Sequence, residues 1–436
     1  MTKYLLKGGT IATCEKGKPG VRVFKSDVLV AGTTITKIEE NMAPEAGVEV
    51  IDCTDKWITP GFVDTHRHVF MAVMRGNHCD WLLTEYFIKS PARHLTVALY
   101  RTVQGDLTPD EVRIGTLAGC LDALHNGVTT LLDHFHAANT RAHLDAALAA
   151  TLESGARLRA DGRVTLGLAY DVLRGADVAP HVEFVRAARA AGARIVTAHA
   201  LVDEHVTAWR DAGLIGTDVP AGARGPRGAA WKVLKESGAG IGATPVDELG
   251  MGHGNPLALE ALARGVKCGL GADAVSINGG DMFTQMRTQL QWSRGATHEN
   301  IRQNKLALPY KNEWNSADVF RLATLGGAEC LNMGDLIGTV EVGKRADLLV
   351  FDTNTPNLGG AADPVTGVVF HAGSEDVETV FVDGEMVKKN GKLVRSWGPV
   401  AMELRKHADA IRERWSANKL EGEWKKWWDT FGSPVW

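Results

Sequence analysis

Closely spaced cysteines are absent from this chain, which excludes the disulfide-rich and zinc-ribbon classes of protein. None of its six cysteines forms a Cys-x-x-Cys pair with another. Scattered thiols are typical of a reduced, cytosolic protein, and we assign them no functional role. The six are Cys14, Cys53, Cys79, Cys120, Cys268 and Cys330.

Long apolar runs and an excess of basic residues are also absent. No segment reaches the roughly eighteen consecutive apolar residues of a transmembrane helix, and the interrupted N-terminus is too short for a signal peptide. The net charge of −4 and the pI near 6.4 offer no basic stripe for a phosphate backbone. The sequence therefore predicts a cytoplasmic protein with no membrane span and no nucleic-acid partner.

Two histidines at the end of an apolar strand are the most informative feature that is present. His66 and His68 follow the run at residues 61–63, and Arg67 separates them. In an extended backbone alternate side chains share a face, so both imidazoles can grip one ion while Arg67 points away. Imidazole paired with carboxylate suits zinc, and also iron or manganese. Alone, such a pair is about as often two ordinary polar residues at a strand end, so the rest of the sequence decides.

Both ends of the chain have the pattern of short antiparallel strands. Apolar and polar positions alternate within residues 1–57, with glycine breaks, and a similar pattern returns within residues 340–395. We therefore predict one small β-sandwich formed by both chain ends. A length of 436 residues fits one large domain with such an accessory piece.

Residues 58–339 alternate strand-like runs with alanine-rich helical stretches. This pattern predicts an α/β fold, a (β/α)8 TIM barrel with its chemistry at the carboxyl ends of the strands. We expect the barrel to be distorted and its third-strand region shortened, because the chain passes from Ala160 into the run at 164–169 with no room for a crossover helix. The strand runs lie at 127–133, 164–169, 193–199 and 266–273, and the helices at Pro109–Asn126, Arg141–Ser154 and Ala179–Ala191.

Histidine and aspartate side chains close several of these runs. A lone histidine after a strand more often makes an ordinary hydrogen bond than binds a metal, by roughly three to one. Several such groups at one barrel mouth reverse that expectation and predict a metal centre. The residues are His66, His68, His136, His199 and Asp273.

Three motifs give the chain a family resemblance. In order they are Pro60-Gly61-Phe62-Val63-Asp64-Thr65-His66-Arg67-His68, Gly269-Leu270-Gly271-Ala272-Asp273 and Gly343-Lys344-Arg345-Ala346-Asp347-Leu348-Leu349-Val350. Together they resemble the amidohydrolase superfamily, specifically the branch with cytosine and guanine deaminases and triazine hydrolases.

That resemblance implies a mononuclear metal site. Its ligands would be His66 and His68 from the first strand, His199 from the fifth and Asp273 from the eighth. The resemblance also implies that the metal lowers the pKa of a bound water, that Asp273 takes the proton, and that hydroxide attacks a C=N or C–N carbon. We predict a metal-dependent hydrolase acting on an amide, imine or amino-heterocycle, with one divalent ion, zinc before iron or manganese.

One position on the sixth strand departs from the family pattern. The family places a further histidine at the end of that strand, but residues 216–225 contain none. We expect Arg224 or solvent in its place, unless His136 or His205 swings in.

A second departure follows His199. Val202 stands where deaminases of this branch carry a glutamate that shuttles protons, with Asp203 and Glu204 just beyond. Both departures argue against deamination of a purine or pyrimidine. They leave an alternative open, in which the same fold serves as a non-hydrolytic metal-dependent lyase or isomerase, or as a non-catalytic binder.

Further polar and aromatic residues are candidates for a pocket that takes a small-molecule substrate. An excursion after the first strand could form an aromatic lid, although packing on the barrel rim is the alternative for Trp81 and Tyr86. The substrate-binding candidates are His136, His253, Arg75 and Trp81, and Glu248 is the candidate auxiliary proton carrier.

Residues 396–436 form a helical, tryptophan-rich tail. Residues 401–419 have the pattern of a charged amphipathic helix, and tryptophans crowd among lysines beyond it. We expect this tail to pack on the barrel or on a second subunit, since amphipathic aromatic residues are favoured at interfaces. The second case predicts a homo-oligomer.

Overall fold

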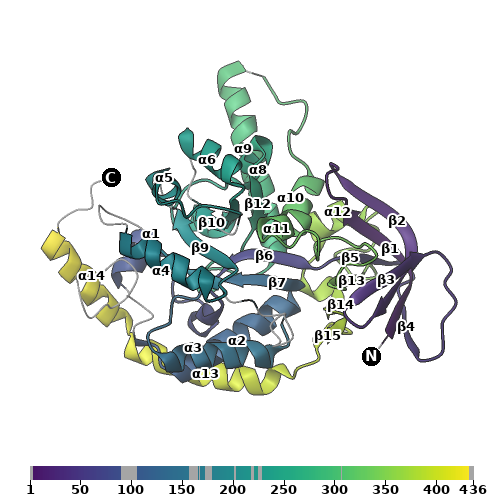
Figure 1. Cartoon of the computed structure of the whole chain (residues 1–436), viewed down its shortest axis with the longest axis horizontal. Helices are drawn as coiled ribbons and strands as arrows, with labels where there is room; N and C mark the ends of the chain where they lie inside the picture. The colour runs from purple at the N-terminus through teal and green to yellow at the C-terminus, as the bar shows by residue number, and fades with distance from the viewer. Residues whose placement is uncertain are drawn as a thin grey trace.

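A parallel barrel and a sheet built from both chain ends make up the protein (Figure 1). The computed structural model describes residues 3–89, 106–156, 165, 167–171, 179–200, 203–217, 220–223, 228–305 and 307–431.

Seven parallel strands of the barrel lie within these described residues. Strand β6 pairs with β7, and the other five form a sheet in the order β12-β11-β10-β9-β8. A parallel bridge between Arg67 and Asp273 joins the end of β6 to the segment after β12. The seven strands are β6 (Phe62–Arg67), β7 (Val128–Asp133), β8 (Gly167–Ala169), β9 (Ile195–Ala200), β10 (Pro220–Ala223), β11 (Gly240–Ala243) and β12 (Lys267–Leu270).

The strands β7 and β8 flank the region predicted to be shortened. Strand β8 has three residues, and His199 lies on β9, the fourth of the seven described strands. The eight-strand count of the prediction therefore exceeds what the described part of the chain contains.

Helices connect and cover these strands. The longest, α9, extends away from the barrel (Figure 1). The helices of this region are η1 (Val69–Met74), α1 (Leu83–Lys89), α2 (Pro109–His125), α3 (Arg141–Ser154), α4 (Ala179–Ala190), α5 (Asp203–Asp211), α6 (Ala229–Ser237), α7 (Pro245–Gly250), α8 (Ala258–Arg264), α9 (Met282–Lys305), α10 (Ser316–Ala323) and α11 (Leu325–Cys330).

Helix α2 shows how local sequence sets these elements. Thr108 and Glu111 form a capping box, in which the Glu111 amide donates to the Thr108 hydroxyl at 3.2 Å and the Thr108 amide donates to the Glu111 carboxylate at 2.8 Å. Along the helix, a Cβ added to Gly115 or Gly119 would lie 2.2 Å from a carbonyl oxygen of η1. The two glycines thus allow α2 to press against the helix that follows the histidine-bearing strand.

Nine strands from the two chain ends share one sheet. Its order is β16-β15-β14-β13-β5-β1-β2-β3, with β4 beside β1, and β13 pairs antiparallel with β5 through Val350 and Ile58. One face buries an apolar cluster that includes Leu6, Val28 and Phe381. The strands are β1 (Lys3–Cys14), β2 (Val21–Ala31), β3 (Thr34–Glu39), β4 (Val48–Asp52), β5 (Lys56–Pro60), β13 (Leu348–Asp352), β14 (Val377–Val382), β15 (Glu385–Lys389) and β16 (Lys392–Leu393), with the short helices α12 (Pro364–Thr366), η3 (Gly367–His371) and η4 (Ser374–Asp376) between them.

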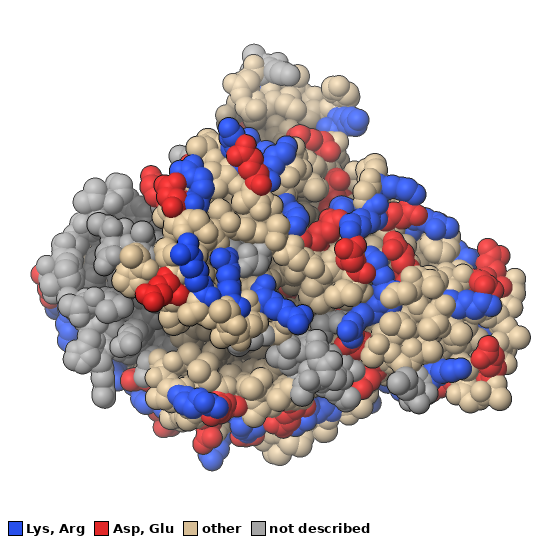
Figure 2. All heavy atoms as spheres, viewed as in Figure 1, with Lys and Arg blue, Asp and Glu red and all other residues tan. Residues whose placement is uncertain are grey.

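The C-terminal tail runs along the barrel as two helices, α13 (Trp397–Arg414) and α14 (Ala417–Phe431) (Figure 1). Arg414 forms an ion pair with Glu111 of α2 at 2.8 Å, and α14 contacts α1. Among the described helices, none has the length and apolar character needed to cross a membrane. Basic and acidic side chains are interspersed over much of the face in Figure 2.

Candidate metal centre

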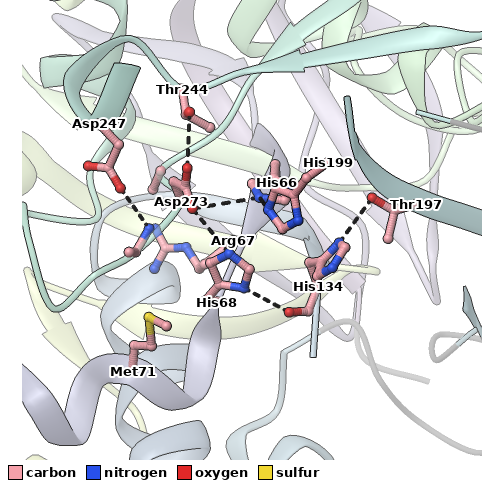
Figure 3. A network of polar contacts seen from close by, with 12 residues as sticks. His66, Arg67, His68, Met71, His134, Thr197, His199, Thr244, Asp247 and Asp273 are labelled. Carbon is pink, nitrogen blue, oxygen red and sulfur yellow. Dashed lines mark hydrogen bonds and ion pairs between the residues drawn. The ribbon is translucent and has the colours of Figure 1, made fainter. Parts of the chain in front are cut away.

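Strand β6 positions the first two predicted ligands. All six of its residues are buried, and His66 and His68 lie at its carboxyl end, where both rings turn toward Asp273 (Figure 3). The Nε2 atom of His66 lies 3.6 Å from Oδ1 of Asp273, and that of His68 lies 3.2 Å from the same oxygen. These two histidines, together with His199 and Asp273, make up the predicted ligand cluster.

The backbone around Asp273 explains how the last of these groups reaches β6. Asp273 has the left-handed conformation, with φ of 54°. Two backbone hydrogen bonds hold it there, because its amide donates to the His66 carbonyl at 2.9 Å and its carbonyl accepts from the His68 amide at 3.0 Å. Gly271 permits the close approach, since a Cβ there would lie 2.5 Å from the His66 carbonyl oxygen.

Hydrogen bonds also fix the Asp273 carboxylate. The Thr244 hydroxyl donates to Oδ2 at 3.2 Å, which leaves Oδ1 toward the two histidines (Figure 3). Burial would raise the pKa of Asp273, but hydrogen bonds and charge interactions with His66 and His68 hold it well below its ordinary value. The Asp273 carboxylate is therefore anionic near pH 7.

His199 enters the cluster from the carboxyl end of β9. Its Nε2 atom lies 3.2 Å from Nε2 of His66. The Asp171 carboxylate, just after β8, accepts from the His199 amide at 2.7 Å and from its ring Nδ1 at 3.0 Å. Burial would raise the pKa of Asp171, but the neighbouring His199 and His134 keep it well below its ordinary value.

His134 lies directly after β7 and, like Asp171, was not predicted from the sequence to belong to the site. Its carbonyl accepts from Nδ1 of His68 at 2.8 Å, and its ring contacts Asp171 at 3.1 Å and Thr197 at 3.3 Å. Their positions in the sequence could have identified both residues, because Asp171 and His134 each follow the end of a barrel strand, as the predicted ligands do.

The donor atoms fit a divalent ion. Two triads each have their ligand atoms within 4.8 Å of one another, and His66 belongs to both: His66 with His68 and Asp273, and His66 with His134 and His199. Atoms about 2.0–2.1 Å from a tetrahedral zinc lie roughly 3.3–3.4 Å apart. Three separations within the ligand cluster, 3.2, 3.2 and 3.6 Å, are close to that value. His199 joins the other groups through His66, since it shares no triad with His68 and Asp273 among the described residues.

Protonation states agree with this fit. Burial lowers the pKa of His66 to about 4, so its imidazole is neutral near pH 7, as a ligand must be. The hydrogen bonds of His68 and His199 occupy Nδ1 in both rings, so Nε2 is the nitrogen that each ring can offer to an ion.

The auxiliary candidate Glu248 is buried on α7. Its Oε1 atom accepts from the Thr244 amide at 2.9 Å, and Oε2 has no hydrogen-bond partner among the described residues. Burial raises the pKa of Glu248 to about 8, with a further contribution from Asp273. Glu248 is therefore protonated near pH 7. Thr244 connects it to the ligand cluster, because its amide donates to Glu248 and its hydroxyl donates to Asp273. The His253 amide donates to the Glu248 carbonyl at 3.0 Å, so His253 closes the end of this helix.

The other pocket candidates lie in two different places. The His136 ring stacks edge-on to His68, with 4.3 Å between centroids, at the rim of the cluster. Trp81 and Tyr86 both pack against His78, whose Nδ1 lies 2.9 Å from the Ser276 hydroxyl. This excursion is thereby fastened to the segment that follows Asp273.

Arg75 points elsewhere. It pairs with Asp122 of α2 at 2.9 Å and borders a cavity of about 580 Å³ between α2 and residues 391–397. None of the ligand cluster lines that cavity.

The described residues cover only part of the region where the sequence lacks a sixth-strand histidine. Strand β10 lies between β9 and β11 and carries no histidine. Val202, Arg224 and the side chain of His205 lie outside the described residues. Glu204 is exposed at the start of α5, so it does not supply the missing glutamate.

Sequence comparisons place these observations among known proteins. The model of the Amidohydrolase family matches residues 57–177 and 176–387. The 5'-deoxyadenosine deaminase of Methanothermobacter thermautotrophicus is 28% identical over 433 residues, which cover 90% of this chain and 95% of that protein. The 5-methylthioadenosine/S-adenosylhomocysteine deaminase of Desulforudis audaxviator is 28% identical over 383 residues, which cover 79% and 84%.

Solved structures with the same architecture include two zinc-bound enzymes. An adenosine deaminase from Xanthomonas campestris superposes with a TM-score of 0.73 at 18% identity, covering 94% of this chain and 99% of that one. The atrazine chlorohydrolase of Arthrobacter aurescens TC1 gives 0.74 at 19% identity, covering 93% and 100%. These likenesses confirm the (β/α)8 TIM-barrel-like fold class.

Proposed function

Because the chain belongs to the amidohydrolase family, as its motifs predicted, we propose that the ligand cluster holds the single divalent ion on which its hydrolysis depends. The chain is a hydrolase of carbon–nitrogen bonds in small molecules, which agrees with the sequence prediction. The observation that carries the proposal is a set of short contacts: His66 Nε2 lies 3.2 Å from His199 Nε2 and 3.6 Å from Asp273 Oδ1, which lies 3.2 Å from His68 Nε2. Zinc is the ion that we propose, since sets of imidazole nitrogens with one carboxylate favour it.

A divalent ion bound there supplies Lewis-acid activation of a water molecule. Asp273 is placed to accept the proton that this water releases, because it is anionic and Thr244 already restrains one of its oxygens. The net reaction breaks one C–N bond and forms one C–O bond, and the nitrogen leaves with an added proton.

Glu248 is our proposal for the group that supplies this proton. With a pKa of about 8, it is protonated near pH 7, so it can donate and then be restored from Asp273 or solvent. It would thus take the part of the glutamate missing at position 202. His136 and His253 remain proposals for substrate contacts at the rim, as does Trp81, whereas Arg75 is directed to a separate cavity.

The substrate class that we propose is an amide, imine or amino-heterocycle. The two relatives described above are named as deaminases of adenosine derivatives, and these names favour the amino-heterocycle within that class. They favour hydrolysis over the lyase, isomerase and binder alternatives. Val202 and the histidine-free sixth strand argue against deamination of a purine or pyrimidine, and this part of the sequence prediction stays untested.

Metal analysis tests the centre. Protein purified without added metal salts should contain about one equivalent of zinc per chain, and His199→Ala should lose it. His298→Ala, on the outlying helix α9, is the matched control and should keep it. A wild-type chain that holds less than about a tenth of an equivalent, and gains none on supplementation, would contradict the proposal.

Turnover tests the chemistry. We expect wild-type protein to release ammonia or an amine from at least one member of a panel of amides, imines and amino-heterocycles, with adenine nucleosides included. Glu248→Gln should retain the ion and lose about 10²-fold or more in kcat. Loss of the ion together with activity would assign Glu248 to structure instead.

Four broader features also stand as proposals: a cytoplasmic location, assembly into a homo-oligomer, no nucleic-acid partner, and a division of the chain into a barrel at 58–339, a sandwich from 1–57 and 340–395, and a tail at 396–436. Support for the division comes from the sheet that joins both chain ends. Light scattering of the purified chain tests the oligomer.

A further inference from the structure

One carboxylate joins two histidines beside the ligand cluster. Asp171 is largely shielded, with 9% of its side chain exposed, and accepts three hydrogen bonds: from the His199 amide at 2.7 Å, from His199 Nδ1 at 3.0 Å and from His134 Nε2 at 3.1 Å. No part of the reaction proposed above uses Asp171 or His134, yet both are held in place by several contacts.

These contacts set the tautomer of His199. A carboxylate at Nδ1 requires a proton on that nitrogen, so Nε2 carries the lone pair that faces His66. The second bond, to the His199 amide, ties the carboxylate to the backbone of the same residue and so restrains the ring in rotation as well.

His134 sets the tautomer of His68 by a separate route. Its backbone carbonyl accepts from Nδ1 of His68 at 2.8 Å, so Nε2 is the nitrogen of His68 that is left to bind an ion beside Asp273 (Figure 3). The ring of His134 uses both nitrogens itself, because Nε2 donates to Asp171 and Nδ1 accepts from the Thr197 hydroxyl.

We propose that Asp171 and His134 are positioning residues that fix the tautomers of His199 and His68, and that His134 is not a ligand of the ion. The inference rests on the proposed metal centre and deepens it. The inference excludes the triad of His66, His134 and His199 as the ion site, because both ring nitrogens of His134 already make hydrogen bonds, to Thr197 and Asp171. Asp171 also adds a second negative charge close to a divalent ion that Asp273 neutralises only in part.

Zinc affinity of the metal-free protein, measured by competition with a chromophoric chelator, tests the proposal. Asp171→Asn should weaken zinc binding by about 10- to 100-fold, the usual effect of losing such a partner. Asp145→Asn, an exposed carboxylate paired with Arg141 on α3, is the matched control and should leave the affinity unchanged.

Two variants at position 134 distinguish positioning from ligation. His134→Gln keeps an N–H that can donate to Asp171, so zinc affinity should stay within about threefold of wild type, whereas His134→Leu should lose about tenfold or more. Equal losses in both variants would assign His134 to the ion and overturn the proposal, as would an affinity in Asp171→Asn within about twofold of wild type.

Imidazole ¹⁵N shifts of the metal-free protein give a readout that does not need an ion. His199 should be in the Nδ1–H form in wild type, and Asp171→Asn should shift it toward the other tautomer while leaving the His68 shifts unchanged. If wild type binds no zinc but shows these shifts, the proposed function fails and the positioning role stands. If His199 keeps its tautomer in Asp171→Asn, the positioning role fails.

Discussion

The most demanding prediction concerns Arg67, the residue between the two strand-end histidines. Its side chain is fully buried and turns away from the ligand cluster. Nε donates to Asp64 at 2.7 Å, Nη2 donates to the Gly280 carbonyl, and Nη1 lies 3.5 Å from Asp122. We predict that Arg67→Met destabilises the metal-free protein.

The magnitude follows from what Arg67→Met leaves behind. Asp64 is also fully buried, and burial already raises its pKa although Arg67 opposes the rise. Removing one partner of such a pair leaves an uncompensated charge, which costs about 3–5 kcal/mol. The damage should reach the metal centre as well, because Asp64 Oδ1 accepts from the amides of His66 and Ala272 at 3.2 Å each.

Urea unfolding of the metal-free protein at neutral pH, followed by circular dichroism, measures the effect. Arg75→Met is the matched control: Arg75 pairs with the same Asp122 but is 39% exposed, so its loss should cost no more than about 1 kcal/mol. The double variant Arg67→Met/Asp64→Leu should regain part of the stability, because it removes the orphaned charge. A loss below about 1 kcal/mol in Arg67→Met, with unchanged unfolding cooperativity, would refute this reasoning.

Three further predictions follow from particular contacts. Gly271→Ala should lower the free energy of unfolding by about 1–3 kcal/mol and weaken zinc binding, because its Cβ would lie 2.5 Å from the His66 carbonyl oxygen. Gly250→Ala is the control: its Cβ would meet no atom within 4 Å, so it should change neither the unfolding nor the zinc titration. Burial raises the pKa of Glu248 from 4.5 to about 8, so the native metal-free protein holds a proton that the unfolded chain loses in this window. Stability should therefore fall as pH rises through it, by up to about 1.4 kcal/mol per pH unit, and an equally steep fall in Glu248→Gln would show that another group is responsible. Thr108→Ala removes the cap of α2 and should cost about 1 kcal/mol in thermal unfolding, and an unchanged melting temperature would argue that the cap is redundant.

Local rules were enough for much of the fold. The helix expected over Arg141–Ser154 has those bounds, and α2 ends one residue before the predicted Asn126. Strand-end reasoning also chose residues that do meet in space, because parallel strands bring their carboxyl ends to one face whatever their order. His66 and Asp273 are adjacent for that reason.

The parts that escaped prediction depend on long-range contacts. At the end of β7 the sequence offers His134 and His136, and only the contacts with Asp171 and Thr197 distinguish their parts. Arg75 follows the first strand closely in sequence, yet η1 and α2 carry it to Asp122 and a cavity outside the cluster. No local sequence pattern predicts these side-chain contacts, because they depend on how the following helices and strands pack.

The sheet that unites the chain ends has a consequence for biosynthesis. Strand β5 runs directly into β6, which carries His66, but its antiparallel partner β13 lies about 290 residues further along the chain. On a ribosome making about 5–20 residues per second, β5 waits on the order of tens of seconds for this partner. The strand that leads to the metal centre therefore stays unpaired on that side until most of the protein has been translated, which makes a nascent chain cut short before β13 a natural substrate for chaperones.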